Sequence, residues 1–377
     1  MDFDLSWLLW GLPIAFVLGW LASRLDLRQL RIENRQAPKA YFRGLNFLLN
    51  EQQDQAIDAF IEAVQNDPDT SELHFALGNL FRRRGEYERA VRIHEHLLSR
   101  GDLSRAERHR AQHALALDFL KAGLLDRAEE ALRKLEGSAF EGQALLALLA
   151  IYERTRDWPQ AAEIARKLEA SGQGDFSGRQ AHYLCEQAGN APPEQAERLL
   201  RQAMEIAPAA ARPGMDLGAL QRRAGNSQAA FKTLARLARS APASIPLVAK
   251  PLTEAAIACG QQAQALEILH GSYELSPSLD VLEGIVALEP DSTAARNWYV
   301  THLEREPSLV AASKWLAGEK LEHEEFHPKV QSALDHAVKP LTRYRCAACG
   351  FEAKQHFWQC PGCQAWDSYP ARRVEEL

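Results

Sequence analysis

The sequence predicts an all-α fold, in which a superhelix of helical hairpins follows one transmembrane helix and precedes a small metal-binding ribbon. Three observations lead to this fold class: an uncharged run near the start, a repeat of about 34 residues through the middle, and two CxxC pairs near the end. The predicted parts are an anchor (1–23), a basic juxtamembrane linker (24–36), the superhelix (37–310), a helical connector (311–341), and the ribbon with its tail (342–377).

The composition is that of ordinary folded protein. Hydrophobic residues make up 46% of the 377 residues and charged residues 25%, which argues against disorder. The formal net charge is -6, without a basic excess, so no nucleic-acid partner is expected. Of the six cysteines, Cys185 and Cys259 stand alone in helical sequence. We expect both to be small core residues, because nothing basic or histidine-rich lies near them.

The first part of the chain has the length and polarity of a membrane anchor. Leu5 to Ala22 is a run of eighteen residues without a charge. As a helix it would span about 27 Å, close to the roughly 30 Å of bilayer hydrocarbon. A cleaved signal peptide is the alternative, but Asp2 and Asp4 precede the run in place of basic residues, and no well-placed small-residue cleavage site follows it. We therefore expect the helix to remain attached.

The charges that flank the apolar run set its orientation. Five basic residues lie between residues 24 and 39, whereas none precedes the run. Positively charged flanks remain on the cytoplasmic side of a membrane. The sequence therefore predicts a single-pass membrane protein whose repeats and ribbon face the cytoplasm.

The middle of the chain repeats with the tetratricopeptide period. From about Ala37 to Pro277, an alanine early in each second helix recurs at spacings of 34, 38, 33, 35, 34 and 35 residues. One helical hairpin cannot bury its apolar face alone, so the period predicts a tetratricopeptide-repeat superhelix with a long concave surface. After Pro277 the period fades into one or two degenerate or capping units. The aligned alanines are Ala56, Ala90, Ala128, Ala161, Ala196, Ala230 and Ala265.

Polar residues near the ends of two first helices are candidates for partner binding. They are Asn79, Arg82 and Arg83 in the second unit, and Arg222 and Arg223 in the sixth. Cations on a concave surface would favour acidic peptide segments or carboxylate termini. Alternatively, arginines late in a helix complement its dipole and stay solvated.

The four remaining cysteines have the spacing of a metal site. Cys346 and Cys349 form one CxxC pair, and Cys360 and Cys363 form the other. Two such turns can place four thiolates around a tetrahedral ion, with no open position for substrate water, so we expect one structural metal ion. Four unligated thiols are disfavoured, because so small a segment has too little core to fold without metal. Zinc is favoured, and iron stays open because it also accepts four sulfurs.

A second metal-like pattern is interpreted as a decoy. His323, Glu324 and His327 match HExxH, in which two histidines one helical turn apart hold zinc and the glutamate acts as base. Pro328 biases His327 away from helical geometry, and no clear third ligand motif follows. No phosphate loop or nucleophile elbow appears elsewhere. The sequence therefore predicts no catalytic residues and no enzyme.

With these parts in order, the whole chain resembles the lipopolysaccharide assembly protein B (LapB) family of the Gram-negative inner membrane. The resemblance rests on the order of anchor, repeats and ribbon, and on the rubredoxin-like stretches YRCAACGF and WQCPGCQAW. It implies an adaptor that regulates lipopolysaccharide synthesis by helping the membrane protease FtsH degrade LpxC, the deacetylase at the committed step of lipid A synthesis. Other lipopolysaccharide-assembly membrane proteins are implied as partners, and homo-oligomerisation stays open. The ribbon cysteines would hold a metal and keep the ribbon packed against the repeats.

Two other classes of protein stay open at this point. A rubredoxin-like electron-transfer protein would carry iron near the surface of the ribbon, and a metalloprotease would hold an open zinc at the HExxH pattern. A scaffold needs binding surfaces and a tether but no reactive group. Metal analysis separates the three, because one zinc per chain that is lost with the cysteines favours the scaffold.

Overall fold

The computed structural model describes residues 14–20, 39–67, 69–319 and 324–377. Residues 14–20 are helical and exposed. No helix in these ranges is long and apolar enough to cross a membrane. Most of the predicted anchor, and all of the predicted linker at 24–36, lie outside the described residues.

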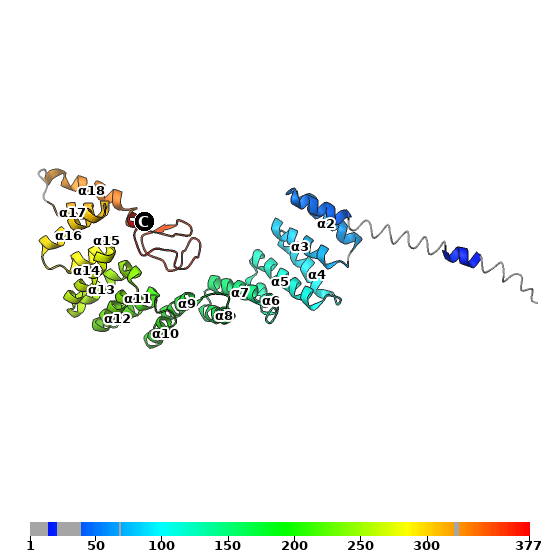
Figure 1. The fold of residues 1–377 in the computed structure, drawn as a ribbon, viewed down its shortest axis with the longest axis horizontal. Coiled ribbons are helices and arrows are strands. Elements are labelled where there is room, and N and C mark those ends of the chain that lie inside the picture. The colour runs from blue at the N-terminus through cyan, green and yellow to red at the C-terminus, as the bar shows by residue number, and fades with distance from the viewer. Residues whose placement is uncertain (1–13, 21–38, 68, 320–323) are drawn as a thin grey trace, which may run out of the picture. The chain divides into compact units, whose positions relative to one another are not determined.

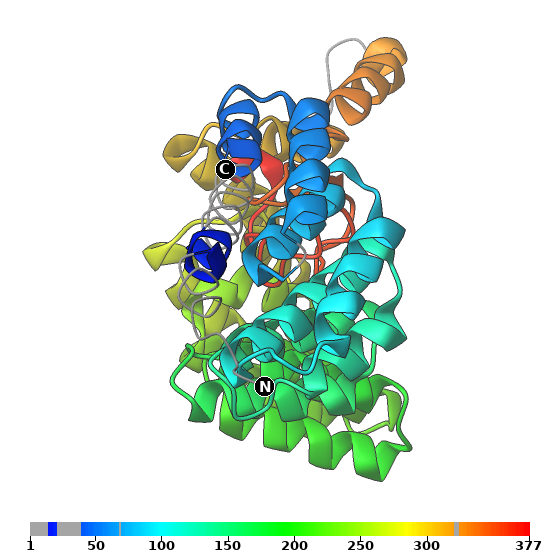
Figure 2. The same cartoon turned by 90° about the vertical axis from the view of Figure 1, so that its right-hand side faces the viewer.

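The described residues form two compact units, Met1–Thr155 and Arg156–Leu377. In the first unit, antiparallel helical hairpins follow one another (Figure 1), and Figure 2 shows the same pairs from a second side. A helix at residues 39–49 comes first. The helices that follow are α2 (Gln53–Asn66), α3 (Ser71–Arg84), α4 (Tyr87–Ser99), α5 (Arg105–Ala122), α6 (Leu125–Arg133) and α7 (Glu141–Thr155).

The second unit contains further hairpins and the ribbon, which lies on the inner side of the curve formed by its helices (Figure 1). Its helices are α8 (Trp158–Ala170), α9 (Ser177–Gly189), α10 (Pro193–Ile206), α11 (Ala211–Arg223), α12 (Ser227–Ser240), α13 (Ile245–Cys259), α14 (Gln262–Leu275), α15 (Leu279–Leu288), α16 (Ser292–Arg305), α17 (Leu309–Ala317) and α18 (His327–Val338). Single 3-10 turns are η1 (Pro242–Ser244), η2 (Glu324–Phe326) and η3 (Val374–Glu376). In the ribbon, β1 (Tyr344–Arg345) pairs antiparallel with β2 (Glu352–Ala353).

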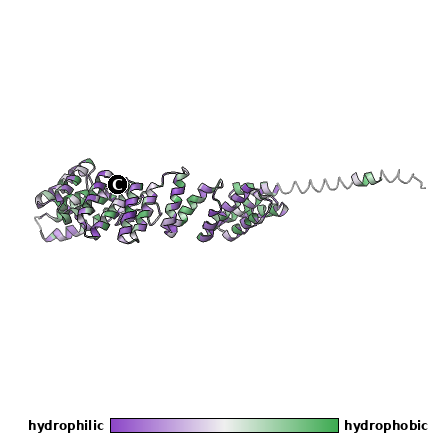
Figure 3. Cartoon of the chain, turned by 90° about the horizontal axis from the view of Figure 1, so that it is seen from below, coloured by the Kyte–Doolittle hydropathy of each residue, from purple (hydrophilic) through white to green (hydrophobic). Residues whose placement is uncertain are grey.

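Burial confirms the repeat register that the alanines predicted. Each of the seven aligned alanines is at most 3% exposed, because it packs where two helices of a hairpin approach closely. At Gly78 in α3 the approach leaves no room for a side chain, since a Cβ there would lie 2.6 Å from the His94 ring of α4. Along the repeat helices polar and apolar residues alternate, as expected for helices buried on one side (Figure 3).

The one long spacing, from Ala90 to Ala128, has a local cause. Helix α5 has 18 residues, whereas α3 has 14. A capping box starts α5, in which the Ser104 hydroxyl accepts from the backbone of Glu107 and the Glu107 carboxylate accepts from the backbone of Ser104. The additional turn of helix therefore accounts for the additional residues in this unit.

Hairpins continue beyond Pro277, where the sequence period fades. Helices α15 and α16 cover the two helical stretches that were expected there, and α17 packs between α16 and α18. Helix α17 crosses residue 310, the position where the sequence suggested a change from superhelix to connector. Helix α18 has no buried residue.

Gly78→Val is expected to destabilise the first unit by roughly 1–3 kcal/mol, because a buried ring blocks the added side chain. His94 is 0% exposed and cannot move aside into solvent. Gly101→Val is the matched control, since a Cβ there meets nothing within 4 Å. Thermal unfolding followed by circular dichroism measures both variants. Equal melting temperatures for the two would contradict the close helix approach.

Candidate metal centre

Two tight backbone turns present the four cysteines. In the first turn the Gly350 N–H donates to the Cys346 carbonyl at 2.9 Å, and in the second the Gln364 N–H donates to the Cys360 carbonyl at 2.8 Å. Gly350 and Gln364 both have a left-handed backbone, with φ of 77° and 62°. Glycine adopts this conformation freely, whereas at Gln364 it is strained and is held by the turn. The two turns are therefore equivalent, although only one contains the favoured residue.

The four cysteine sulfurs gather at one point. They all lie within 4.8 Å of one another, with 3.8 Å between Cys346 and Cys363 and 3.7 Å between Cys349 and Cys360. Four sulfurs bonded to one tetrahedral zinc at about 2.3 Å would be separated by about 3.8 Å. The site therefore has the ligand type and the spacing to bind one metal ion, which would supply a structural cross-link between the two turns.

Hydrogen bonding favours the ionised form of one thiol. The Ser368 hydroxyl, 3.3 Å from the Cys346 sulfur, lowers the pKa of that thiol to about 6. The Phe351 backbone N–H acts in the same direction on Cys349, but desolvation and the neighbouring thiols raise the Cys349 pKa to about 12. Four thiolates this close repel one another, so full ionisation requires a cation among them.

Two residues just beyond Cys363 attach the ribbon to the repeats. The Trp366 ring stacks on His182 of α9 with centroids 4.8 Å apart, and its edge meets Trp158 of α8 at 6.2 Å. His182 is 2% exposed and donates from Nε2 to both carboxylate oxygens of Asp367 at 2.9 Å. Packing of the ribbon against the repeats, which the family resemblance implied, is therefore present within the second unit.

The C-terminal tail binds the N-terminus of α17. The Glu375 carboxylate accepts hydrogen bonds from the backbone N–H of Leu309 at 2.6 Å and from the Ser308 hydroxyl at 2.7 Å. The first backbone N–H groups of a helix have no partner within the helix, and the helix dipole favours an anion there. Glu375 therefore adds a second cap to α17, where the Ser308 hydroxyl already accepts from the Ala311 N–H at 2.9 Å.

The neighbouring tail residues bind α15 in the same way. Glu376 accepts from the backbone N–H of Leu279 at 2.9 Å, and burial raises the pKa of this carboxyl. Arg373 forms a 2.7 Å ion pair with Asp280 in the first turn of α15, and its guanidinium lies 4.2 Å from the centre of the Tyr344 ring. The last residues thus join the ribbon to two repeat helices.

The partner-binding candidates of the second repeat, which lies in the first compact unit, differ in what they contact. Arg82 donates to the Asp118 carboxylate at 2.9 Å and the Ala114 carbonyl at 3.0 Å, both in α5, and it also bonds Asn79. Asp118 is fully buried and also contacts His94 at 2.5 Å. Arg82 therefore joins neighbouring repeats, whereas Arg83 is exposed.

The candidates of the sixth repeat, which lies in the second compact unit, also differ. Arg222 of α11 forms an ion pair with Glu254 of α13, again between neighbouring repeats. Arg223 is exposed and lines a cavity of about 270 Å³ beside Cys185 and Arg212. Of the five candidates, Arg83, Arg222 and Arg223 are exposed, and Arg222 is engaged in the ion pair between repeats.

The HExxH residues do not share a helix in the described part of the chain. Glu324 lies in η2, and α18 begins at His327, whose Nε2 donates to the Leu316 carbonyl at 3.1 Å. His323 lies outside the described residues. Within the described ranges, the four ribbon cysteines are the one group of potential ligands close enough to hold a metal.

The two lone cysteines lie in the repeats, as expected. Cys185 is 3% exposed, and burial raises the pKa of its thiol. Cys259 is half-buried and packs against the core of the second unit. The raised pKa keeps the Cys185 thiol protonated, whereas a nucleophilic cysteine reacts as the thiolate.

The docking residues Trp366, Asp367, His182 and Trp158 were not recognised from the sequence. Aromatic residues beside a CxxC pair were visible, but His182 and Asp367 are 185 positions apart. The tail residues were missed for a different reason, because an acidic chain end ordinarily remains solvated. A carboxylate becomes a helix cap only when a helix begins beside it.

Trp366→Ala should release the ribbon from the repeats without loss of metal, because the ring lies outside the four sulfurs. Trp366 is half-buried, so its removal should destabilise packing by less than the roughly 3–5 kcal/mol that a fully buried tryptophan contributes. Limited proteolysis after α18 reports the release, and metal content per chain reports the centre. Glu352→Ala is the matched control, since Glu352 pairs with Arg345 inside the ribbon at 2.7 Å. A proteolysis pattern equal to that of the control would count against docking through Trp366.

Stacked hairpins with a 34-residue period and a four-cysteine ribbon define a tetratricopeptide-repeat protein with a rubredoxin-type metal domain. Two family models match in agreement with this class, a tetratricopeptide repeat at residues 73–110 and a rubredoxin metal binding domain at residues 344–369. Lipopolysaccharide assembly protein B of Escherichia coli strain K12 is 31% identical over 381 residues, covering 97% of this chain and 98% of the relative. The chain belongs to the lipopolysaccharide assembly protein B family, a family of repeat-bearing adaptors rather than enzymes.

One further relative and one solved structure are similar to this chain. Lipopolysaccharide assembly protein B of Haemophilus influenzae is 28% identical over 383 residues, covering 95% of this chain and 96% of the relative. Among solved structures, the complex of Naa15/Naa10 bound to HypK-THB aligns with a TM-score of 0.46 at 15% identity. That alignment covers 81% of this chain and 48% of the solved chain.

Proposed function

We propose that the protein is an inner-membrane-anchored adaptor that regulates lipopolysaccharide synthesis by promoting FtsH-dependent proteolysis of LpxC. The observation that carries the proposal is full-length similarity to relatives that are named for lipopolysaccharide assembly. The described residues support an adaptor, since they form stacked repeats with extended surfaces. An adaptor raises the concentration of a substrate beside its protease and needs no reactive group of its own.

The anchoring part of the proposal places residues 1–23 in the membrane as a single span, followed by the linker at 24–36. Support comes from residues 14–20, where Phe16 is 76% and Leu18 is 63% exposed. Adjacent apolar side chains on an exposed helix suit a lipid environment better than water. The basic residues after the span would hold the repeats and ribbon in the cytoplasm.

The metal part of the proposal assigns one structural ion to Cys346, Cys349, Cys360 and Cys363, zinc in preference to iron. The ion would hold together the ribbon, whose own buried cluster is small and includes Tyr344 and two of the cysteines. Fixed in this way, the ribbon can dock through Trp366 and through the tail. In the adaptor, the metal would therefore hold the ribbon in the conformation that docks on the repeats, and it would take part in no reaction.

For partner contacts we propose Arg83 in the first unit and Arg223 in the second, which are exposed and cationic. Acidic segments of LpxC or FtsH would suit them. Arg82 and Arg222 support these two positions indirectly, because each bonds a neighbouring repeat of its own unit, and Asn79 bonds Arg82 within α3.

Electron transfer is the second candidate, and one observation favours it. Cys349 and Cys363 are exposed, so two of the four ligands face the surface, as a redox centre requires. Metal analysis of the purified chain decides between the two roles. One zinc per chain supports the adaptor, whereas iron that is reversibly oxidised and reduced supports electron transfer.

Recovery of both FtsH and LpxC with the affinity-tagged full chain from solubilised membranes is the expected result for the adaptor. Both proteins should be enriched over a control purification with an unrelated single-pass protein that carries the same tag. A variant with Arg83→Glu and Arg223→Glu should recover less LpxC or less FtsH, because acidic partners would be repelled. Equal recovery with the unrelated control would rule out the proposed partners.

A further inference from the structure

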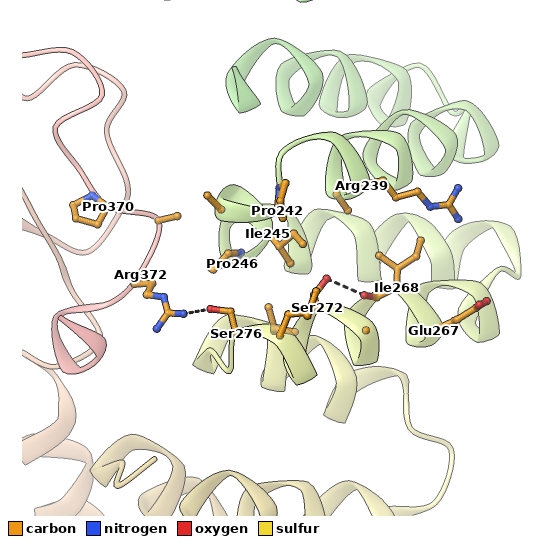
Figure 4. Close-up of a pocket in the computed structure, with 16 residues that line it drawn as sticks. Arg239, Pro242, Ile245, Pro246, Glu267, Ile268, Ser272, Ser276, Pro370 and Arg372 are labelled. Carbon is orange, nitrogen blue, oxygen red and sulfur yellow. Dashed lines mark hydrogen bonds between the residues drawn. The ribbon is translucent and has the colours of Figure 1, made fainter. Parts of the chain in front are cut away.

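A groove of about 880 Å³ lies in the second unit beside α12, α14 and the C-terminal tail (Figure 4). Its volume is within the range of about 300–1,000 Å³ that is usual for binding sites. The repeats form most of its lining, and Pro370, Ala371 and Arg372 of the tail contribute the rest. The groove lies apart from the four sulfurs and is not used in the metal centre.

The lining of the groove is mostly apolar. Pro242, Ile245, Pro246 and Ile268 lie between its two ends (Figure 4). Leu275, the last residue of α14, also lines the groove and is 87% exposed. An exposed leucine such as Leu275, next to other apolar lining residues, is typical of a protein interaction site.

Charged side chains of both signs lie at the ends of the groove. Arg239 and Glu267 lie toward one end, and Arg372, which bonds the Ser276 hydroxyl, lies toward the other (Figure 4). Glu267 would repel the phosphate of an anionic lipid that approached Arg239. Mixed charges around an apolar centre instead match a protein segment with charged residues beside an apolar face.

The prolines favour a helical segment over an extended one. Pairing with an extended strand requires a row of free backbone N–H and C=O groups, and Pro242, Pro246 and Pro370 have no N–H to offer. An α-helix satisfies its own backbone bonds and presents only side chains. Its residues at intervals of three and four can enter an apolar groove together.

We propose that this groove binds an amphipathic helix of a protein partner, with the apolar face of the helix on Pro242, Ile268 and Leu275 and an acidic residue beside Arg239. The inference rests on the proposed adaptor function, because it assigns a surface on which an adaptor can hold a partner. The groove also depends on the ribbon. Its tail wall follows Tyr369, which packs with Cys346 and Cys360 in one buried cluster, and the ion pair of Arg373 with Asp280 holds the tail against α15.

Site-specific photo-crosslinking in membranes tests the groove with the full chain. A photoreactive residue in place of Leu275 should form an adduct with a protein partner at about ten times the yield obtained at Ile257. Ile257 is the matched control, because it is 52% exposed and apolar but does not line the groove. Arg239→Glu, combined with the probe at Leu275, should lower the adduct yield about fivefold, because the acidic residue of the partner would be repelled.

Mass spectrometry of the adduct identifies the partner and the crosslinked segment. An amphipathic helix of FtsH or LpxC supports both the groove and the proposed function. An amphipathic helix of another protein supports the groove and counts against the proposed partners. A lipid adduct, an adduct with a second copy of this chain, an extended segment, or a yield no higher than at Ile257 overturns the inference.

Discussion

Replacement of Cys346 and Cys349 by serine is expected to abolish metal binding and unfold the ribbon. Structural zinc sites contribute on the order of 10–16 kcal/mol of apparent binding free energy. The buried cluster of the ribbon is small and includes two of the cysteines themselves, so apolar packing cannot replace the ion. The repeats should remain folded, because their cores are built from α-helical hairpins.

Three measurements on the purified chain check this result. Metal content should fall from one ion to none, protease should cut within residues 342–377, and the far-ultraviolet helical signal should change little. Cys259→Ser is the matched control, because Cys259 is a half-buried cysteine in the repeats. Unchanged metal content in the double variant would show that the ion is held elsewhere.

Removal of residues 1–23 is expected to cause the largest functional loss while leaving the repeats folded and the ribbon metal-loaded. Linking two partners through a common tether can raise effective affinity by about 10²–10⁴ without new contacts. Without the anchor, partner surfaces remain but this gain is lost, so cellular LpxC should rise toward the level seen without the gene. An unrelated transmembrane helix of the same orientation should restore at least part of the function.

Glu324→Gln is the control that separates an adaptor from a hydrolase. In an adaptor the Glu324 carboxylate takes part in no reaction. LpxC abundance in the Glu324→Gln variant should therefore stay at the wild-type level when protein levels are matched. If Glu324→Gln raises LpxC as strongly as gene deletion while the anchorless chain behaves normally, the adaptor account is wrong and HExxH catalysis must be reconsidered.

Local patterns in the sequence were sufficient to predict the repeats and the cysteine cluster. The alanine period reports helix packing within one hairpin, and each CxxC pair is a single turn. The seven aligned alanines are buried, and the four cysteine sulfurs lie within 4.8 Å of one another. Both results follow from contacts between residues that are near each other in the sequence. The 38-residue spacing was also visible, but its cause, a longer α5, required the structure.

Contacts between distant segments could not be predicted in the same way. From the sequence, Arg82 is either a groove cation or a solvated residue at the end of its helix. The structure adds a bond to Asp118 in the next repeat, because stacking brings α3 and α5 together. The acidic residues Glu375 and Glu376 had no evident role until the starts of α17 and α15 were placed beside them. These contact pairs form only when the repeats stack. A single sequence therefore gives no sign of them at either position.

The central claim, that the protein is a tether between a protease and its substrate, is tested most directly by LpxC degradation in reconstituted membrane vesicles. Vesicles containing purified FtsH are supplied with LpxC, with or without the full chain in the same membrane, and intact LpxC is followed over time. The account predicts faster loss of LpxC when the full chain is present, little acceleration by the anchorless chain, and no loss when FtsH is omitted. LpxC cleavage without FtsH, or an unchanged rate when the full chain is added, would contradict it.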